Sequence, residues 1–169
     1  MHSFDNLIQR STSFTLIALN DAHQQLSETF EYNASTSMVK NLQMIRLTKA
    51  IFAVGMFSMF DGELQKKLSC ENGFNQASII LKQKGENNLN QRFLDFKDAI
   101  NVLKHGDGPS YKRLLKKIEP LPFRMKRHGV HFFEEGDVSE VSTLIEVNDK
   151  FIDDCVELIS SVYQVIRKH

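Results

Sequence analysis

The chain has 169 residues, of which 41% are hydrophobic and 25% are charged, so its length and composition fit one domain over residues 1–169 with a buried core. Its 21 Lys and Arg balance 21 Asp and Glu, which excludes a globally charge-driven attraction to nucleic acid or to an anionic membrane. Two cysteines are too few for a disulfide framework, and no charged stretch leads into an apolar one near residue 1, so we expect a cytoplasmic protein.

Two long helices are predicted in the first 68 residues. Apolar side chains recur near 3.6-residue spacing over residues 4–30, with polar residues between them, which is typical of an amphipathic helix. A second helix is expected from about Ser37 to Leu68. Its apolar stretch, Ala50 to Phe60, has eleven residues, fewer than the roughly 20 that a membrane span needs. We therefore expect this stretch to be the buried centre of a bundle, with no membrane contact.

Three helices are predicted next, each bounded by glycine or proline, and the one over residues 88–105 is the longest of them. Residues 75–84 have helical spacing and stop before a glycine. Residues 88–105 resume that spacing, and Gly106 is a typical helix stop. Pro109 can begin a further helix, which ends by residue 118 because Pro120 follows.

The last third of the chain combines an uncertain segment with a predicted long helix. Residues 123–136 are compatible with a short hairpin around His128-Gly129 or with an extended strap. A final helix is expected from Ser139 to Arg167, with Asp137 and Glu140 forming its capping box. The prediction is an all-α, up-and-down bundle of four long helices plus one or two short helices, with a possible short hairpin or strap near 123–135.

Three polar residues share one face of the helix predicted over 88–105. Asp98, Asn101 and His105 fall nearly opposite the apolar stripe, so we expect them to face away from the core. At a helix C-terminus the macrodipole favours a protonated imidazole. His105 can therefore act as a proton shuttle, or it can simply cap the helix before Gly106.

The turn that follows this helix has two interpretations. Its sequence, Gly-Asp-Gly-Pro-Ser from Gly106 to Ser110, can cradle an anion on free backbone N–H groups, with Lys112 and Arg113 close behind. It can equally be an ordinary inter-helix turn, because it lacks the Gly-Lys-Ser or Gly-Lys-Thr ending of a P-loop.

Charge is asymmetric in the second half of the chain. Seven Lys or Arg and two acids lie between His105 and His131, whereas residues 132–154 contain eight acids and one lysine. The basic segment is able to hold a phosphate backbone, or it is a solvated face that pairs with the acidic segment of the same chain.

The block Asn101-Val-Leu-Lys-His105-Gly106 resembles the Arg-Asn-x-x-x-His block of the HEPN superfamily of bacterial helical-bundle proteins, many of which are RNases of toxin, defence and stress systems. Phe57 to Leu64 is similar to the family's apolar helix that carries an acidic residue, and the long final helix also fits. The resemblance implies a homodimer whose paired helices form an RNase site that needs no metal.

Under this resemblance Asn101 and His105 match the family block, and Asp61 or Glu63 would be the acidic partner. His105 would move a proton and Asn101 would orient the phosphate. Ile100 stands at the family's arginine position, and an isoleucine cannot stabilise a charged transition state. Either a basic residue elsewhere takes this role or the protein is non-catalytic. The residues expected to hold phosphate groups are Lys104, Ser110, Lys112, Arg113, Lys116, Arg124 and Arg127.

Two histidines outside this block are candidate metal ligands. His128 and His131, with Glu134 and Glu135 beyond them, have suitable donor atoms for a divalent ion. They lack the helical His-Glu-x-x-His order and cysteine ligands, so we predict surface histidines and no metal or other cofactor.

Three functions therefore remain open for the chain. The first is a HEPN-like RNase or RNA-binding protein of toxin or defence type. The second is a non-catalytic dimerising bundle that serves as a protein-interaction or regulatory module. The third is a nucleotide-binding bundle that uses the turn from Gly106 to Ser110. The missing arginine makes nuclease activity the less favoured property of a HEPN-like helical protein.

Overall fold

A computed structural model of the chain describes residues 3–30, 36–117, 121–132 and 140–168. Its helices are α1 (Phe4–Phe30), α2 (Thr36–Leu68), α3 (Gly73–Gln83), α4 (Asn87–His105), α5 (Pro109–Leu115) and α6 (Asp149–Arg167). Over the described residues there is no strand beyond one isolated bridge between Met125 and Ile145. The predicted all-α bundle of four long helices and two short ones is confirmed.

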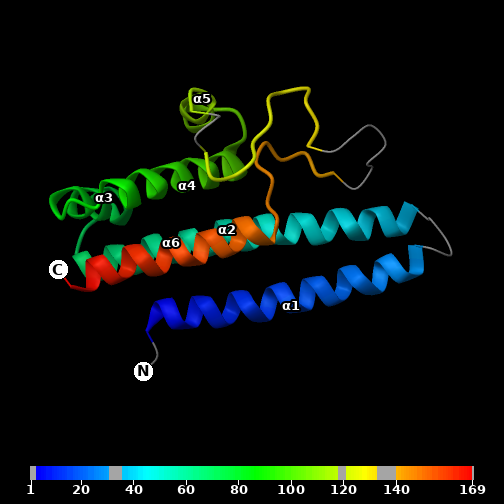
Figure 1. Ribbon diagram of the computed structural model, residues 1–169, viewed down its shortest axis with the longest axis horizontal. Coiled ribbons are helices and arrows are strands. Elements are labelled where there is room, and N and C mark those ends of the chain that lie inside the picture. Colours follow the sequence, from blue (N-terminus) through cyan, green and yellow to red (C-terminus); the bar gives the residue numbers. More distant parts are fainter. Residues whose placement is uncertain (1–2, 31–35, 118–120, 133–139, 169) are drawn as a thin grey trace.

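Helices α2 and α6 are the central members of the bundle, because each of them packs against α1, α3, α4 and the other (Figure 1). The inner face of α2 carries Ala53, Phe57, Phe60 and Leu64, each at most 1% exposed. Phe60 lies against Phe4 of α1 and Phe93 of α4, with ring centroids 6.1 and 6.4 Å away. Burial of such large apolar side chains is the main force that holds the helices together.

Helices α1 and α2 form a long antiparallel hairpin. The stacked rings of Phe4 and Phe60, together with the 3.8 Å contact from Thr12 Oγ1 to Met56 Sδ, fix its register. Figure 1 shows that the second half of α1 and the first half of α2 extend past the beginning of α6. This part of the hairpin therefore has fewer helices packed on it than the rest of the bundle.

By length and composition, residues Val39–Leu68 could cross a membrane. A core helix of a bundle meets the same criterion, and the inner face of α2 is buried against four other helices. The criterion therefore does not separate a membrane span from a core helix in this chain.

The prediction of a final helix from Ser139 was wrong by ten residues. Helix α6 begins at Asp149, where the Asn148 side chain caps it by accepting a 2.9 Å hydrogen bond from the Phe151 amide. Glu140 lies outside any helix, and Asp137 lies outside the described residues. The segment before α6 has alternating β-branched residues, Val141, Thr143, Ile145 and Val147, a period that favours extended backbone over helix.

That extended segment pairs with the uncertain segment of the sequence. The Lys126 amide donates to the Leu144 carbonyl at 3.0 Å, and the Glu146 amide donates to the Arg124 carbonyl at 3.1 Å. A turn does form at His128-Gly129, but the partner of residues 124–126 is 144–146, not the sequence just after the turn. Residues 121–132 therefore form a strap across the bundle rather than a local hairpin; residues 133–136 lie outside the described part.

Candidate functional site

Helix α5 covers the polar face of α4 on which the candidate site lies. Asp98 points away from the bundle core, as the sequence indicated, yet it is only 9% exposed because α5 packs over it. Its carboxylate accepts hydrogen bonds from Arg113 Nε at 2.8 Å, Arg113 Nη2 at 2.5 Å and Ser110 Oγ at 2.9 Å. Asp98 therefore faces away from the core, as expected, but it is covered by α5 and not by solvent.

A second ion pair extends this contact along the two helices. Lys117, just after α5, lies 3.3 Å from the carboxylate of Asp95, which is 7% exposed. The hydrogen bond to Asp98 raises the pKa of the Arg113 guanidinium, and burial only partly opposes it. Arg113 and Lys117 are thus used to attach α5 to α4.

The two residues that match the family block lie in different surroundings. The Asn101 side-chain amide donates to Ser110 Oγ at 3.4 Å, which places it beside Asp98 and Arg113. His105 is exposed at the last position of α4, and Gly106 ends the helix with a left-handed φ of 68°. Within the described part of the chain, the His105 side chain has no hydrogen bond or ion pair. These surroundings fit the interpretation in which His105 simply caps the helix before Gly106.

The predicted acidic partner does not join this group. Asp61 accepts from the Phe74 amide at 3.1 Å and from the Gln65 side chain at 2.8 Å, so it holds the start of α3. Its neighbour Phe60 contacts Phe93, twelve residues before His105 on α4. At 1.5 Å per residue, about 18 Å of helix separates that level from His105. The alternative, Glu63, accepts from the Tyr163 hydroxyl at 3.3 Å.

Ile100 occupies the family's arginine position and faces the core, where it is 3% exposed. An arginine at this position would have to bury its charge among apolar side chains, which is costly without a partner. Of the possible replacements, Lys104 and Lys112 are exposed. Arg113 is the one brought close to Asn101, but the carboxylate of Asp98 neutralises its charge.

Side chains of the turn from Gly106 to Ser110 are engaged by contacts within the chain. Ser110 directs its hydroxyl proton to Asp98, and the short α5 that follows has seven residues. Asp107 lies 3.3 Å from His128 across the turn. Two carboxylates thus flank the proposed cradle, which fits an ordinary inter-helix turn.

Much of the basic segment is paired within the chain. Arg124 lies 3.0 Å from Glu146, and Lys126 pairs with Glu140 in a bridge whose two side chains are 11% and 10% exposed. The alternative in which the basic segment pairs with the acidic one is therefore correct for these residues. Among the described residues, four of the predicted phosphate ligands have no ion pair and are exposed: Lys104, Lys112, Lys116 and Arg127. RNA binding by them stays a prediction.

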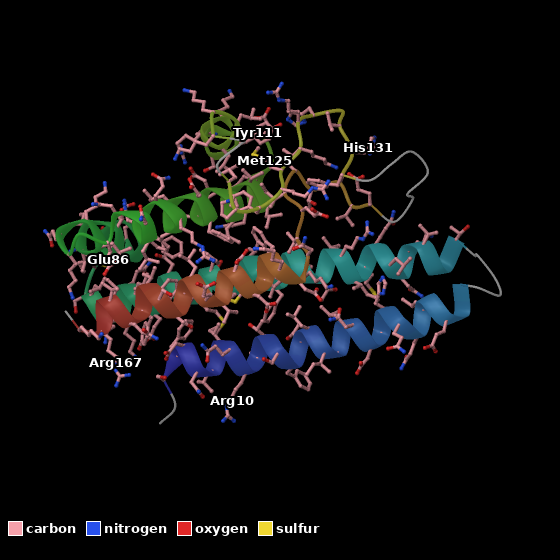
Figure 2. All side chains as sticks on the ribbon, viewed as in Figure 1. Arg10, Glu86, Tyr111, Met125, His131 and Arg167 are labelled. Atoms are coloured by element: carbon pink, nitrogen blue, oxygen red, sulfur yellow. The ribbon has the colours of Figure 1, made fainter. Side chains whose placement is uncertain are left out.

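The two candidate metal-binding histidines, His128 and His131, both lie on the strap. The Tyr111 hydroxyl donates to the Lys126 carbonyl at 3.2 Å, and Figure 2 shows Tyr111 beside Met125 above α4. His128 packs its ring on Tyr111 at 5.3 Å, whereas His131 Nδ1 lies 3.4 Å from Glu140. No group of three possible metal ligands occurs among the described residues, which do not include Glu134 and Glu135.

The sequence interpretation missed an apolar surface on the α1–α2 hairpin. The stretch Ala50 to Phe60 was expected to be buried throughout, but Ile51 is 63% exposed and Met59 is 64% exposed. The sequence did indicate this exposed apolar surface, because a helix that is apolar all round has an apolar outer face as well. We call the following residues the outer apolar face: Leu7, Phe14, Ile17, Met44, Leu47, Ile51 and Met59.

Comparisons with protein-family models, with curated proteins and with solved structures gave no match to this chain.

Proposed function

We propose that the protein is a HEPN-like helical bundle without nuclease activity, and that it functions by self-association through the outer apolar face. The observation that carries the proposal is the exposure of this face, where Phe14 is 76% exposed and the other side chains are 48–64% exposed. Large apolar side chains in water cost free energy, which burial against another protein surface recovers.

The outer apolar face includes residues of α1 and α2 that lie at the same level of the hairpin. The contacts of Phe4 with Phe60 and of Thr12 with Met56 bracket Leu7 and Met59, which therefore lie at the same level of the hairpin. The seven large side chains of this face are each 48–76% exposed, and an exposed apolar patch of this kind marks protein–protein contact sites. A stable interface takes about 800 Å² from each partner.

The candidate catalytic residues support the absence of nuclease activity. Cleavage of RNA by acid–base catalysis needs a cation or other donors aimed at the phosphate. Ile100 is buried in the core, Arg113 is neutralised by Asp98, and Asp61 is used at the start of α3. His105 is exposed and has no hydrogen-bond or ion-pair partner among the described residues, but the structure brings neither Asp61 nor an unpaired arginine to it.

Sedimentation velocity tests the self-association directly. The wild-type protein is expected to be a dimer at micromolar concentration, and a variant with Phe14→Asp and Ile51→Asp is expected to be a monomer, because each aspartate would be desolvated in the interface. Ser13→Asp is the matched control, since it adds a charge to an exposed position of α1 outside the outer apolar face. A wild-type protein that is still a monomer at about 100 micromolar would contradict the proposal, because its dimerisation would then be weaker than about 5.5 kcal/mol.

Incubation with single-stranded RNA tests the catalytic part. Wild-type protein and His105→Ala are both expected to leave the RNA intact from pH 5 to pH 9. The His105→Ala change is also expected to alter the free energy of unfolding by no more than about 0.5 kcal/mol, since the side chain is exposed. RNA cleavage that the wild type performs and His105→Ala lacks would establish the nuclease function instead.

A further inference from the structure

We propose that the end of the strap, residues 126–132, is a pH-sensitive cover, which two histidine–carboxylate pairs hold in mildly acidic solution and release as the pH rises towards about 8. We call these residues the distal strap. Their release does not involve the outer apolar face, so the proposal goes beyond self-association. It rests on how the strap is attached to the rest of the molecule.

The two parts of the strap are attached by different forces. The first part is apolar, because Leu121, Phe123 and Met125 pack against the hydrophobic core. The Phe123 ring lies 5.2 Å from that of Phe96 in α4 and 5.6 Å from that of Phe151 in α6. In the distal strap, by contrast, three basic side chains pair with carboxylates of other segments: Lys126, His128 and His131.

Two of these three ion pairs involve histidine. His128 Nε2 lies 3.3 Å from the carboxylate of Asp107, in the turn between α4 and α5. His131 Nδ1 lies 3.4 Å from the carboxylate of Glu140, in the segment before α6. Histidine is the side chain whose charge changes between about pH 5 and 8. Each pair is therefore an attraction between opposite charges in mild acid, and it loses its positive charge as the pH rises.

The other groups beside these histidines are compatible with both pairs. The His128 ring also packs on Tyr111 of α5, with ring centroids 5.3 Å apart. Lys126 shares Glu140 with His131, but the lysine pairs with Oε1 and the histidine with Oε2. A carboxylate can accept on both oxygens at once. Protonated His131 is thus a second cation on a carboxylate whose side chain is 10% exposed.

The pH dependence has two limbs of opposite sign. The attached strap binds the imidazole protons more tightly than the released strap, because only attachment keeps a carboxylate beside them. Attachment is therefore favoured where the histidines are protonated and weakens as the pH rises. In stronger acid the carboxylates lose their charge, and all three pairs weaken. The distal strap is thus expected to be held most tightly between about pH 5 and 6.

Release of the distal strap would change a cavity. Phe132 and Glu140 line a cavity of about 250 Å³, together with Ile45 and Lys49 of α2. The Phe132 amide donates to Glu140 at 3.2 Å, next to the His131 pair. Loss of these contacts would therefore open one wall of the cavity.

Hydrogen exchange measured by NMR tests the proposal. The Phe132 amide, which donates to Glu140, reports release of the distal strap, and the Ala99 amide, inside α4, reports opening of the bundle. We compare wild type with a variant carrying His128→Gln and His131→Gln. After division by the intrinsic rates, Phe132 is expected to exchange about fivefold faster in the variant at pH 5.5, a modest factor because both histidines are exposed. At pH 7.5 the two proteins are expected to exchange alike, and Ala99 is expected to be unchanged at both pH values.

Two further variants are controls. His105→Gln removes an exposed histidine outside the strap, so Phe132 is expected to exchange as in wild type at both pH values. The variant with His128→Lys and His131→Lys keeps positive charge at both pH values. Its Phe132 amide is therefore expected to be as well protected at pH 7.5 as at pH 5.5.

Three results would overturn the proposal. The first is equal Phe132 exchange in wild type and in the double glutamine variant at pH 5.5. The second is the same increase at both pH values, since the loss would then come from packing and not from charge. The third is faster exchange of Phe132 and Ala99 together, which would mean that the histidines stabilise the whole bundle and that the strap is not released by itself.

Discussion

Replacing Lys126 with methionine is expected to lower the free energy of unfolding by about 3–5 kcal/mol, which urea denaturation followed by circular dichroism will measure. Lys126 and Glu140 are 11% and 10% exposed, and their ion pair joins the strap to the segment before α6. Methionine keeps the length of the side chain but removes the lysine, so the Glu140 carboxylate keeps only the Phe132 amide and the His131 ring as partners. Buried charges that lose their partner are strongly destabilising.

The matched control removes both charges. Glu140→Gln keeps an oxygen that accepts from the Phe132 amide, which now donates to Glu140 at 3.2 Å. The double variant, Lys126→Met with Glu140→Gln, is therefore expected to regain more than half of the lost stability. If the double variant is as unstable as the sum of the two single variants, the pair is not coupled as described.

This ion pair also gives an expected pH dependence. Burial by itself raises the pKa of the Glu140 carboxyl, but hydrogen bonds from Lys126 and from the Phe132 amide outweigh it and lower the net pKa. A lowered folded-state pKa contributes stability above the unfolded value, about 4.3, which is lost as the pH falls through the folded value. The difference between wild type and Lys126→Met should therefore shrink in acid.

Replacing Phe60 with alanine is expected to cost about 3–5 kcal/mol, a large part of the roughly 5–15 kcal/mol by which a domain of this kind is stable. Phe60 is 0% exposed, and its ring lies 6.1–6.4 Å from those of Phe4, Phe74 and Phe93. These rings come from α1, α3 and α4, so alanine would leave a cavity where four helices meet. Urea denaturation at a fixed protein concentration measures the change.

Phe14→Ala is the control for this change, because the same side chain is removed from a position that is 76% exposed. It is expected to change the stability of the monomer by no more than about 0.5 kcal/mol and to weaken dimerisation instead. Equal losses of monomer stability for Phe60→Ala and Phe14→Ala would show that the assignment of inner and outer faces is wrong.

The helices were predictable where one local period dominates the sequence. Residues 4–30 and about 37–68 were expected to be helical, and α1 and α2 have these bounds within one residue. The start of α6 was not predictable from the sequence. Residues 141–147 combine the apolar spacing of a helix with the alternating β-branched residues of an extended segment, and their pairing with residues 124–126 decides in favour of the extended segment. That pairing is a contact between segments distant in sequence, which a local pattern does not contain.

The candidate site was predictable only as a set of residues. The sequence placed Asp98, Asn101 and His105 on one face of α4, and in the structure this face lies opposite the core. Which of them meets solvent depends on α5, which covers Asp98 and leaves His105 exposed. Asp61 was grouped with them by resemblance, but its position is set by the start of α3.

By itself, the sequence determined the all-α architecture, because the period of apolar residues and the positions of glycine and proline act within a few residues of the chain. Only the tertiary structure decided which polar side chains are paired and which apolar ones remain in water. Ile51 and Phe57 are both large apolar residues of α2, yet one is 63% exposed and the other 1%. The difference arises because burial is determined by the neighbouring helices, and a neighbour's position is not a local property of the residue it covers.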